Sequence, residues 1–371
     1  MKNIFGNALT VTLFGESHGA AIGAVIDGIA PGIEVDTDYI DAKLSLRRPS
    51  GKISTARQEK DEYSILSGVY NGKTTGTPIC ITIPNSDTHS KDYSALSGKA
   101  RPGHSDYPAY EKYHGFEDAR GGGHFSGRIT AALVAAGALV QSALKQKGIY
   151  IGTHISRLGG VCDAKMCAES DVKKLEMIEF PVLDAVAGDK MQAAILAARE
   201  ECDSIGGVLE TAVVGMPAGV GEPWFDTVES LLSHALFSVP AIKGVEFGDG
   251  FALADMKGSQ ANDAYRIKDG KIVTETNHMG GIGGGITNGM PIVFRCAVKP
   301  TPSIAQKQHT VDFIKGENAD VEISGRHDPC IVHRARAVID AVTALTLADM
   351  LTVRYGTDWL ATCKQLASKA R

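Results

Sequence analysis

Residues 120–144, RGGGHFSGRITAALVAAGALVQSAL, join a glycine-rich loop to an apolar segment. Gly121, Gly122 and Gly123 lack a Cβ, so the backbone can adopt positive φ and approach a flat or phosphorylated ligand closely. The apolar run 129–144 predicts a helix buried on most of its faces, and the N–H groups at its start would face an anion. A tight turn before a core helix is an equally good explanation of the glycines. The polar side chains around them favour a functional site; they are Arg120, His124, Ser126 and Arg128.

The chain has 371 residues, a length that fits either two domains or one large domain of mixed helices and strands. Its composition, 43% hydrophobic and 22% charged, is that of an ordinary globular protein. The net charge of −5 argues against binding to nucleic acid or to an anionic membrane, because such partners require a basic surface. No charged and apolar leader opens the sequence, and the apolar run near Ile129 is too short and too rich in Ala and Gly for a membrane span. We therefore expect a cytoplasmic protein.

Several familiar motifs are absent. The seven cysteines are odd in number and include no CxxC pair, so we expect reduced thiols, no disulfide framework and no metal site. Residues 68–74 have three residues between their glycines where a phosphate loop has four. In 280–289, Ile286 takes the last glycine position of G-x-G-x-x-G, which disfavours a dinucleotide fold.

The pentapeptide GESHG, at 15–19, lies between predicted strands at 8–14 and 21–29. Strand ends place side chains reproducibly, which suits a site that uses Ser17 and His18. A capped turn is the alternative. The spacing matches the G-x-S-x-G elbow of serine hydrolases, but that elbow requires a helix after the strand, and here a second strand follows.

A basic loop follows a helix predicted from Thr37 to about Arg47. Its cations are Arg47, Arg48, Lys52, Arg57 and Lys60. Two interpretations stay open. Charge runs are often solvated surfaces, whereas paired arginines also bind carboxylate and phosphate groups through bidentate hydrogen bonds.

Three further turns carry polar side chains. In RPGHSDY, at 101–107, the Pro-Gly turn presents His104 and Asp106. KPTPS, at 299–303, is a rigid polar turn after a predicted strand. GRHDPC, at 325–330, precedes a long predicted helix at 331–351, where an Arg and an Asp form either a salt-bridged cap or part of a site.

The order strand, turn with Gly and Pro, then helix occurs twice. It is found at 21–46 and again at 206–236. Chance similarity is one explanation; the other is an internal duplication, with two related halves packed as one domain. Between these segments, 148–160 predicts a strand and 191–202 a helix, while the polar region 162–190 indicates no chemistry.

Taken together, seven motifs in one order over residues 5–351 resemble the chorismate synthase family. They are GESHG with its trailing IDGIAPG, the RRP of the basic loop, RPGHSDY, RGGGHFSGR, GGIGGGITNG, KPTPS and GRHDPC. The resemblance implies an α+β fold covering 1–371 as a single domain. This fold is a β-α-β sandwich, with helices between antiparallel sheets and an internal pseudo-twofold. The resemblance also implies a homotetramer.

The implied activity is that of a lyase. It is the anti-1,4-elimination of phosphate from 5-enolpyruvylshikimate-3-phosphate, which gives chorismate, the last common step of the shikimate pathway to aromatic amino acids. Reduced FMN is required, with no net redox change. Some members of the family reduce the flavin themselves with NADPH and others depend on a separate flavin reductase, and the sequence leaves both routes open.

The resemblance also implies roles for particular residues. His18 would protonate the departing phosphate, His104 would tune the reduced flavin, and Asp328 would help N5 of the flavin to accept the substrate proton. A substrate with two carboxylates and a phosphate requires several cations. The substrate-binding candidates are Ser17, Arg47, Arg48, Arg128 and Arg326. The flavin-binding candidates are His124, Phe125, Ser126, Pro240, Ala241, Gly284, Lys299, Pro300, Thr301, Pro302, Ser303 and Arg326.

The chain departs from the family pattern at a few positions. His124 and Phe125 stand where many members have Arg and Ser, and Pro302 replaces a Ser. Two other functions remain open. A flavin oxidoreductase would oxidise its substrate stoichiometrically with a nicotinamide, and a catalytically silent protein would only bind a phosphometabolite. His18, His104 and Asp328 together argue against silence.

Overall fold

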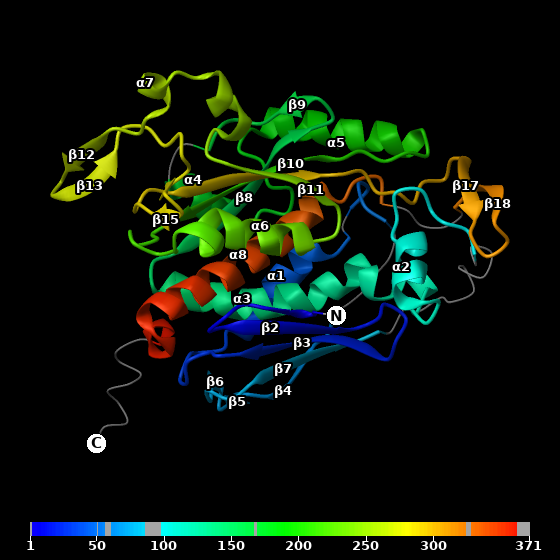
Figure 1. Ribbon diagram of the computed structural model, residues 1–371, viewed down its shortest axis with the longest axis horizontal. Coiled ribbons are helices and arrows are strands. Elements are labelled where there is room, and N and C mark those ends of the chain that lie inside the picture. The colour runs from blue at the N-terminus through cyan, green and yellow to red at the C-terminus, as the bar shows by residue number, and fades with distance from the viewer. Residues whose placement is uncertain are drawn as a thin grey trace.

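Two five-stranded antiparallel sheets enclose a layer of helices (Figure 1). The computed structural model describes residues 2–49, 51–55, 61–85, 98–166, 169–323 and 328–361. The first sheet has the strand order β1-β2-β3-β7-β4, and the second has the order β11-β16-β10-β8-β9. Every pairing within them is antiparallel among the residues described. The α+β sandwich that the motifs implied is thereby confirmed.

The element bounds are as follows. The first sheet contains β1 Ile4–Phe5, β2 Thr10–Gly15, β3 Ala21–Asp27, β4 Ser64–Ser67 and β7 Ile79–Pro84. The second contains β8 Tyr150–Leu158, β9 Val161–Cys162, β10 Gly207–Val214, β11 Ile242–Phe247 and β16 Ile292–Val298. Four small hairpins are β5 Val69–Tyr70 with β6 Lys73–Thr74, β12 Tyr265–Lys268 with β13 Lys271–Thr274, β14 Ile282–Gly283 with β15 Ile286–Thr287, and β17 Gln308–Asp312 with β18 Glu317–Val321. The α-helices are α1 Thr37–Arg47, α2 Asp106–Tyr113, α3 Thr130–Gln146, α4 Glu169–Leu175, α5 Ala185–Glu200, α6 Val228–Ser238, α7 Gly258–Ala261 and α8 Val332–Tyr355. The 3-10 helices are η2 Arg120–Phe125, η3 Gly127–Ile129, η4 Trp224–Asp226, η5 Gly250–Asp255 and η6 Thr357–Leu360.

The two halves of the chain repeat one topology. The first half runs β2, β3, α1, β4, β7, α3, and the second runs β8, β10, α6, β11, β16, α8. Within the sheets, β2-β3-β7-β4 corresponds to β8-β10-β16-β11, in the same order. The strand-turn-helix units at 21–46 and 206–236 are β3 with α1 and β10 with α6, which occupy equivalent places in the two halves. The suspected duplication is therefore a property of the fold.

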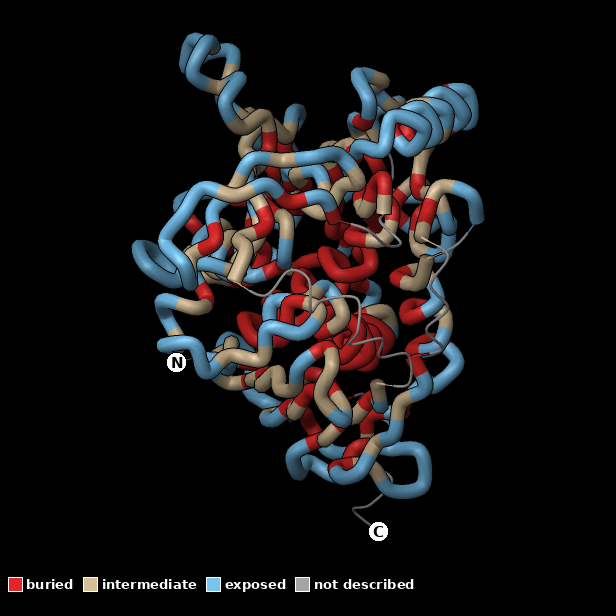
Figure 2. The backbone as a smooth tube through the Cα atoms, turned by 90° about the vertical axis from the view of Figure 1, so that its right-hand side faces the viewer, coloured by how far each residue is buried: buried red, intermediate tan, exposed pale blue. Residues whose placement is uncertain are grey.

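The helix layer is held together by close contact between α3 and α8. Every residue of α3 from Thr130 to Leu144 is buried, as the run of small apolar residues predicted. A Cβ added to Gly137 would lie 2.4 Å from the Cβ of Ala341 on α8. Glycine and alanine at the crossing thus allow the two helices to pack with little separation. Figure 2 shows this buried backbone gathered in the middle of the molecule.

Two boundaries differ from the sequence predictions. The cap of α1 is Asp36, not Thr37, because the Asp36 carboxylate accepts a hydrogen bond from Tyr39 N at 2.9 Å. Helix α5 begins at Ala185, six residues before the predicted start, after its cap Asp184. Gly188 in its first turn and the polar pair Asp189 and Lys190 after it concealed the beginning of the helix.

Among the described residues, the segment Gly127–Gln146 is long and apolar enough to cross a membrane by length and composition alone. The expectation that this run is too short is therefore wrong. In the structure 89% of the apolar window is buried inside the protein. Its hydrophobicity is explained by its position between the first sheet and α8.

Candidate active site

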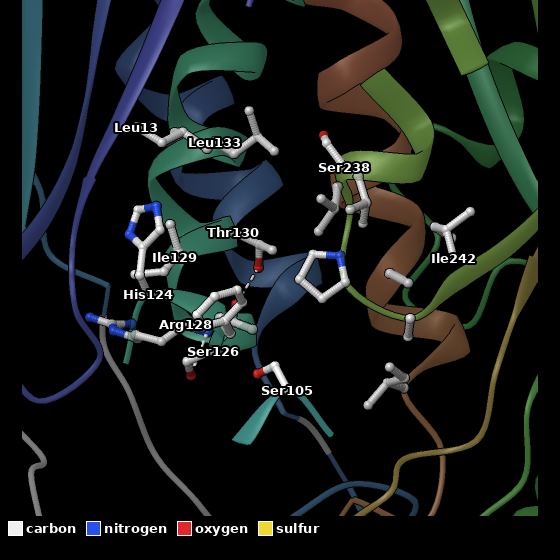
Figure 3. Close-up of a pocket in the computed structure, with 18 of the residues that line it drawn as sticks. Leu13, Ser105, His124, Ser126, Arg128, Ile129, Thr130, Leu133, Ser238 and Ile242 are labelled. Carbon is white, nitrogen blue, oxygen red and sulfur yellow. Dashed lines mark hydrogen bonds between the residues drawn. The ribbon is translucent and has the colours of Figure 1, made fainter. Parts of the chain in front are cut away.

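A cavity of about 910 Å³ lies between α3, α6 and α8, below the loops that leave the two sheets. Figure 3 shows Ile129 and Leu133 on the α3 side, facing Ser238 and Ile242 across it. The volume is near the upper end of the ~300–1,000 Å³ typical of small-molecule sites. The lining is partly apolar and partly formed by cations, imidazoles and one carboxylate; these side chains are Lys2, Arg47, Arg101, His104, His124, Arg128, His234, Lys243, Lys299, Asp328 and Arg334.

The arginines reach the cavity from separate elements. Arg47 is the last residue of α1, and Arg128 belongs to the 3-10 turn that leads into α3. Arg128 donates to Asn85 Oδ1 at 3.1 Å and to Pro84 O at 3.2 Å, which anchors it to the end of β7. The basic loop is thus part of a concave site, at least at Arg47, and the interpretation as a solvated surface is wrong for that residue.

His104 belongs to a compact ionic group at the start of α2. Its Nδ1 lies 2.7 Å from Asp106 Oδ1, and Arg101 binds the same carboxylate through Nε at 2.8 Å and Nη2 at 2.7 Å. Burial opposes ionisation of Asp106, but the hydrogen bonds from Arg101 and His104 outweigh it and hold the pKa of this carboxyl well below its usual range. The imidazole is therefore held through one nitrogen by a permanent anion.

The glycine loop separates two imidazole rings. Gly121, Gly122 and Gly123 all have positive φ. A Cβ on Gly121 would lie 2.0 Å from Cε1 of His18, and one on Gly122 would lie 3.3 Å from Cε1 of His104. The close approach that these glycines permit is thus to His18 at Gly121 and to His104 at Gly122.

Asp328 lies just before α8, on the wall of the cavity. Its carboxylate accepts hydrogen bonds from Thr55 N at 2.9 Å and from Arg334 Nη1 at 2.6 Å. Arg334 also donates through Nε to Arg47 O at 2.7 Å, so the acid is tied to the end of α1. Cys330, two residues on, is fully buried, and burial raises the pKa of its thiol to about 12.

The flavin-binding candidates that line the cavity come from three segments. They are His124, Phe125 and Ser126, then Pro240 and Ala241, then Lys299, Thr301, Pro302 and Ser303. His124 Nδ1 is 2.7 Å from Gly15 O, which ties the glycine loop to β2. Ala241 has φ of 75°, unusual for a residue with a Cβ, and its carbonyl accepts from Lys299 N at 2.9 Å. Burial and then the charge of Lys243 lower the pKa of Lys299.

Other candidates are not among the described residues that line the cavity. Ser17 and His18 lie behind Gly121, with Ser17 Oγ 3.0 Å from His18 Nδ1. Arg48 and Pro300 are also outside the lining. Arg326 lies outside the described residues.

Gly284 is placed far from the other candidates. Val228 N, at the start of α6, donates to Gly285 O at 3.0 Å, whereas the cavity is at the opposite end of that helix, beside Ser238. The α6 residues that line the cavity begin at His234, six residues after Val228, which is about 9 Å at about 1.5 Å per residue. The structure therefore does not bring Gly284 to this cavity.

Sequence reasoning missed several residues of the site. Arg101 lies in the RPGHSDY motif, where the turn points to His104 and Asp106, and the pattern around Arg334 predicts only a core helix. No sequence pattern marks Thr55 or Asp61. The partner of Thr55 is Asp328, 273 residues away, and the partners of Asp61 belong to two separate elements. Among the described residues, no three His, Cys, Asp or Glu side chains gather as a metal site.

Comparisons with known proteins agree with this arrangement. The family model for chorismate synthase matches residues 9–352. A chorismate synthase from Pyrococcus abyssi is 47% identical over 349 residues, which cover 94% of this chain and 97% of the relative. One from Aeropyrum pernix is 46% identical over 355 residues, 95% of this chain and 93% of the relative. A crystal structure of chorismate synthase superposes with a TM-score of 0.75 at 29% identity, covering 98% of this chain and 96% of that one. The chain therefore belongs to the chorismate synthase family.

Proposed function

We propose that this chain is a lyase that converts 5-enolpyruvylshikimate-3-phosphate to chorismate by anti-1,4-elimination of phosphate, with reduced FMN bound and no net redox change. The observation that carries the proposal is the convergence of Arg47, Arg101 and Arg128 with His104 and Asp328 on one cavity. These residues come from four separate parts of the sequence, since Arg101 and His104 share one motif. A packed core needs no such group of cations, whereas a trianionic substrate does.

The arginines have the chemistry to hold the substrate. Each guanidinium presents a planar set of donors that matches a carboxylate or a phosphate. Arg47 and Arg128 are almost fully buried, so their charges are screened little by water and act strongly on an anion. Binding would place the phosphate and carboxylates against fixed charges.

Proton transfer falls to the histidines and Asp328. An imidazole can donate a proton near neutral pH, which suits the departure of phosphate. His18 would supply that proton, with Ser17 Oγ at 3.0 Å from its Nδ1 to fix the ring. Asp328, held by Thr55 and Arg334, would hold or pass on the proton that leaves the substrate carbon.

The donor set of the cavity also fits a flavin phosphate and ring system. Lys243 and Lys299 line it beside the Thr301 and Ser303 hydroxyls, and Phe125 with the apolar walls of α3 and α8 offers a surface for a flat ring. When bound, reduced FMN would supply transient electron density to the reacting substrate. The protein would orient both molecules and exclude water.

The proposal includes a homotetramer, with the flavin reduced either by NADPH on this protein or by a separate flavin reductase. Large apolar side chains on the second half support self-association. Trp224 is 84% exposed and Phe225 is 89% exposed, and the protruding β12–β13 hairpin presents Ile267 and Ile272 (Figure 1). Exposed apolar side chains of this size are typical of interaction surfaces.

The test is an anaerobic assay with 5-enolpyruvylshikimate-3-phosphate, run once with oxidised FMN and once with chemically reduced FMN. We expect chorismate and phosphate only with reduced FMN, in amounts far above the amount of flavin. Product in a one-to-one ratio to flavin, with the flavin oxidised, would support an oxidoreductase instead. No product despite bound flavin and substrate would support a silent binding protein.

A further inference from the structure

Asp61 lies among three arginines, Arg47, Arg48 and Arg128, which we call the arginine cluster. Its carboxylate is fully buried, and it accepts two hydrogen bonds from Arg47 Nη2, at 3.2 Å to Oδ1 and 2.9 Å to Oδ2. Arg128 Nη1 contacts Oδ1, and Arg48 Nε lies 3.7 Å from Oδ2. One carboxylate thus lies beside three of the four arginines that were predicted to bind the substrate.

The charges of these four side chains do not cancel one another. Three guanidinium groups and one carboxylate carry a net charge of +2 among these four side chains. Burial opposes ionisation of Asp61, but Arg47 and Arg128 outweigh it and hold the pKa of the carboxyl below its usual range. Asp61 therefore stays ionised, and it offsets part of the mutual repulsion of the arginines.

The position of Asp61 requires an unusual backbone. Its φ is 50°, in the left-handed region that residues other than glycine seldom adopt, although Asp and Asn tolerate it best. Strained residues of this kind persist when their surroundings hold them in place, and they concentrate at functional sites. Here the strain directs the carboxylate to the point where α1 and the turn before α3 meet.

We propose that Asp61 is a positioning residue, which holds the cavity arginines Arg47 and Arg128 in the geometry that binds the anionic substrate. The inference rests on the proposed function, because it takes these arginines as the substrate-binding group. Asp61 would act through them, without touching the substrate. Arg47 would be most affected, since Asp61 accepts both of the hydrogen bonds described for its Nη2.

The position of the arginines and the net charge of the cluster predict opposite effects of a substitution at Asp61 on substrate binding. The substitution Asp61→Asn keeps the size of the side chain and the tolerance for positive φ, and it raises the charge of the cluster from +2 to +3. Coulomb attraction alone would then make an anion bind more tightly. If position decides, the released arginines bind it more weakly despite the extra charge.

The experiment measures binding of 5-enolpyruvylshikimate-3-phosphate by titration calorimetry, and FMN binding separately by fluorescence. For Asp61→Asn we expect the Kd of the substrate to rise about 10-fold or more, which corresponds to the loss of one charge-assisted hydrogen bond. We expect Asp61→Glu, which keeps the charge but displaces it by one methylene, to bind with intermediate affinity. The Kd of FMN should change less than that of the substrate in both variants.

A matched control separates positioning from stability. Asp340→Asn also removes a fully buried carboxylate, one that pairs with Lys43 at 3.3 Å and with Arg336 at 3.7 Å outside the cavity lining. We expect it to lower Tm without weakening substrate binding. Equal weakening in this variant would assign the effect of Asp61 to general stability and overturn the proposal.

The remaining outcomes are also decisive. Unchanged or tighter substrate binding by folded Asp61→Asn would overturn the proposal, and if that variant does not fold, wild-type affinity in Asp61→Glu would do so. Failure of the wild-type chain to bind the substrate would count against the proposed function instead. In that case the Kd of inorganic phosphate, compared between wild type and the two variants, still tests Asp61.

Discussion

Gly121 lies so close to His18 that its missing side chain is part of the site. Any Cβ there would lie within 2.4 Å of two ring atoms of His18, and the residue also has φ of 60°. The glycine triplet therefore serves the placement of imidazole rings as well as the turn itself.

We predict that Gly121→Ala lowers kcat by about 100-fold, the scale of a lost general acid, because the methyl group displaces His18. Steady-state assays with saturating substrate and reduced FMN measure this. The control is Gly72→Ala, where φ is 73° but no atom lies within 4 Å of the added Cβ. It carries the same backbone cost and should keep wild-type kcat; equal losses in both variants would show that backbone strain alone is responsible.

Asp106 offers a second prediction at this scale. Asp106→Asn removes the charge beside His104 Nδ1 while preserving the shape of the side chain. We expect kcat to fall by about 100-fold, because an amide does not fix the ring orientation of His104 as the carboxylate does. Asp320→Asn removes a similar pair with His309 on the exposed β17–β18 hairpin and should leave kcat unchanged. Wild-type kcat in Asp106→Asn would remove Asp106 from the mechanism.

Among the elements, the second sheet carries a row of charges across its strands. His154 on β8, Glu210 on β10, Arg295 on β16 and Glu246 on β11 are neighbours in register, each in contact with the next. His154 also binds Asp163, from the polar region that the sequence left without a role. The sheet therefore contains a buried histidine between two carboxylates.

This arrangement predicts a pH dependence of stability. Burial lowers the pKa of His154, but the hydrogen bonds that its ring donates to Glu210 and Asp163 outweigh it, so the folded-state pKa is raised. The stabilisation is then fully present below the unfolded value of about 6.5 and is lost as pH rises through the folded-state pKa. His154→Gln should lower the free energy of unfolding by about 1–3 kcal/mol near pH 5.5, and by less near pH 9.

Denaturant unfolding at both pH values measures this difference. His309→Gln, which changes a histidine that is 96% exposed in a surface pair with Asp320, is the control and should show no such dependence. A loss in His154→Gln that is equal at both pH values would mean that shape, not charge, is what His154 contributes.

For the whole molecule, we infer a single domain, because one continuous cluster of buried side chains extends from Leu9 to Ala361 and includes both sheets and the helices between them. The cavity lies within this shared body. Its walls come from β2 and α3 of the first half and from α6 and α8 of the second. Neither half could form the site alone.

We also predict that the exposed aromatic residues of the second half hold copies of the chain together. Replacing both Trp224 and Phe225 by Ser should reduce the mass in solution below that of the wild type, because about 25 cal/mol is lost for each Å² of apolar surface no longer buried. Light scattering after size-exclusion chromatography measures the mass. Tyr70→Ser, at a residue 73% exposed on the first half, is the control. An unchanged tetramer in the double variant would exclude this surface, and a wild-type monomer would exclude the tetramer.

Much of the fold was determined by the local sequence. The apolar run of α3, the helix from Thr37 to Arg47, and the strands on either side of GESHG follow from residue periodicity and turn chemistry, which act between near neighbours. The order of the motifs indicated the family and, with it, the sandwich. The same motifs predicted the candidate residues His104, Arg128, Lys299 and Asp328, and these four residues line one cavity.

The tertiary structure alone decided which of these residues meet. Asp328 is held by Thr55, Asp61 joins arginines from two separate elements, and Gly284 lies at the far end of α6 from the other candidates. Such contacts join residues up to 273 positions apart, and no local pattern records them. The contact between Thr55 and Asp328 forms only when the two similar halves pack α3 against α8, because that packing sets the distance between the loops of one sheet and those of the other.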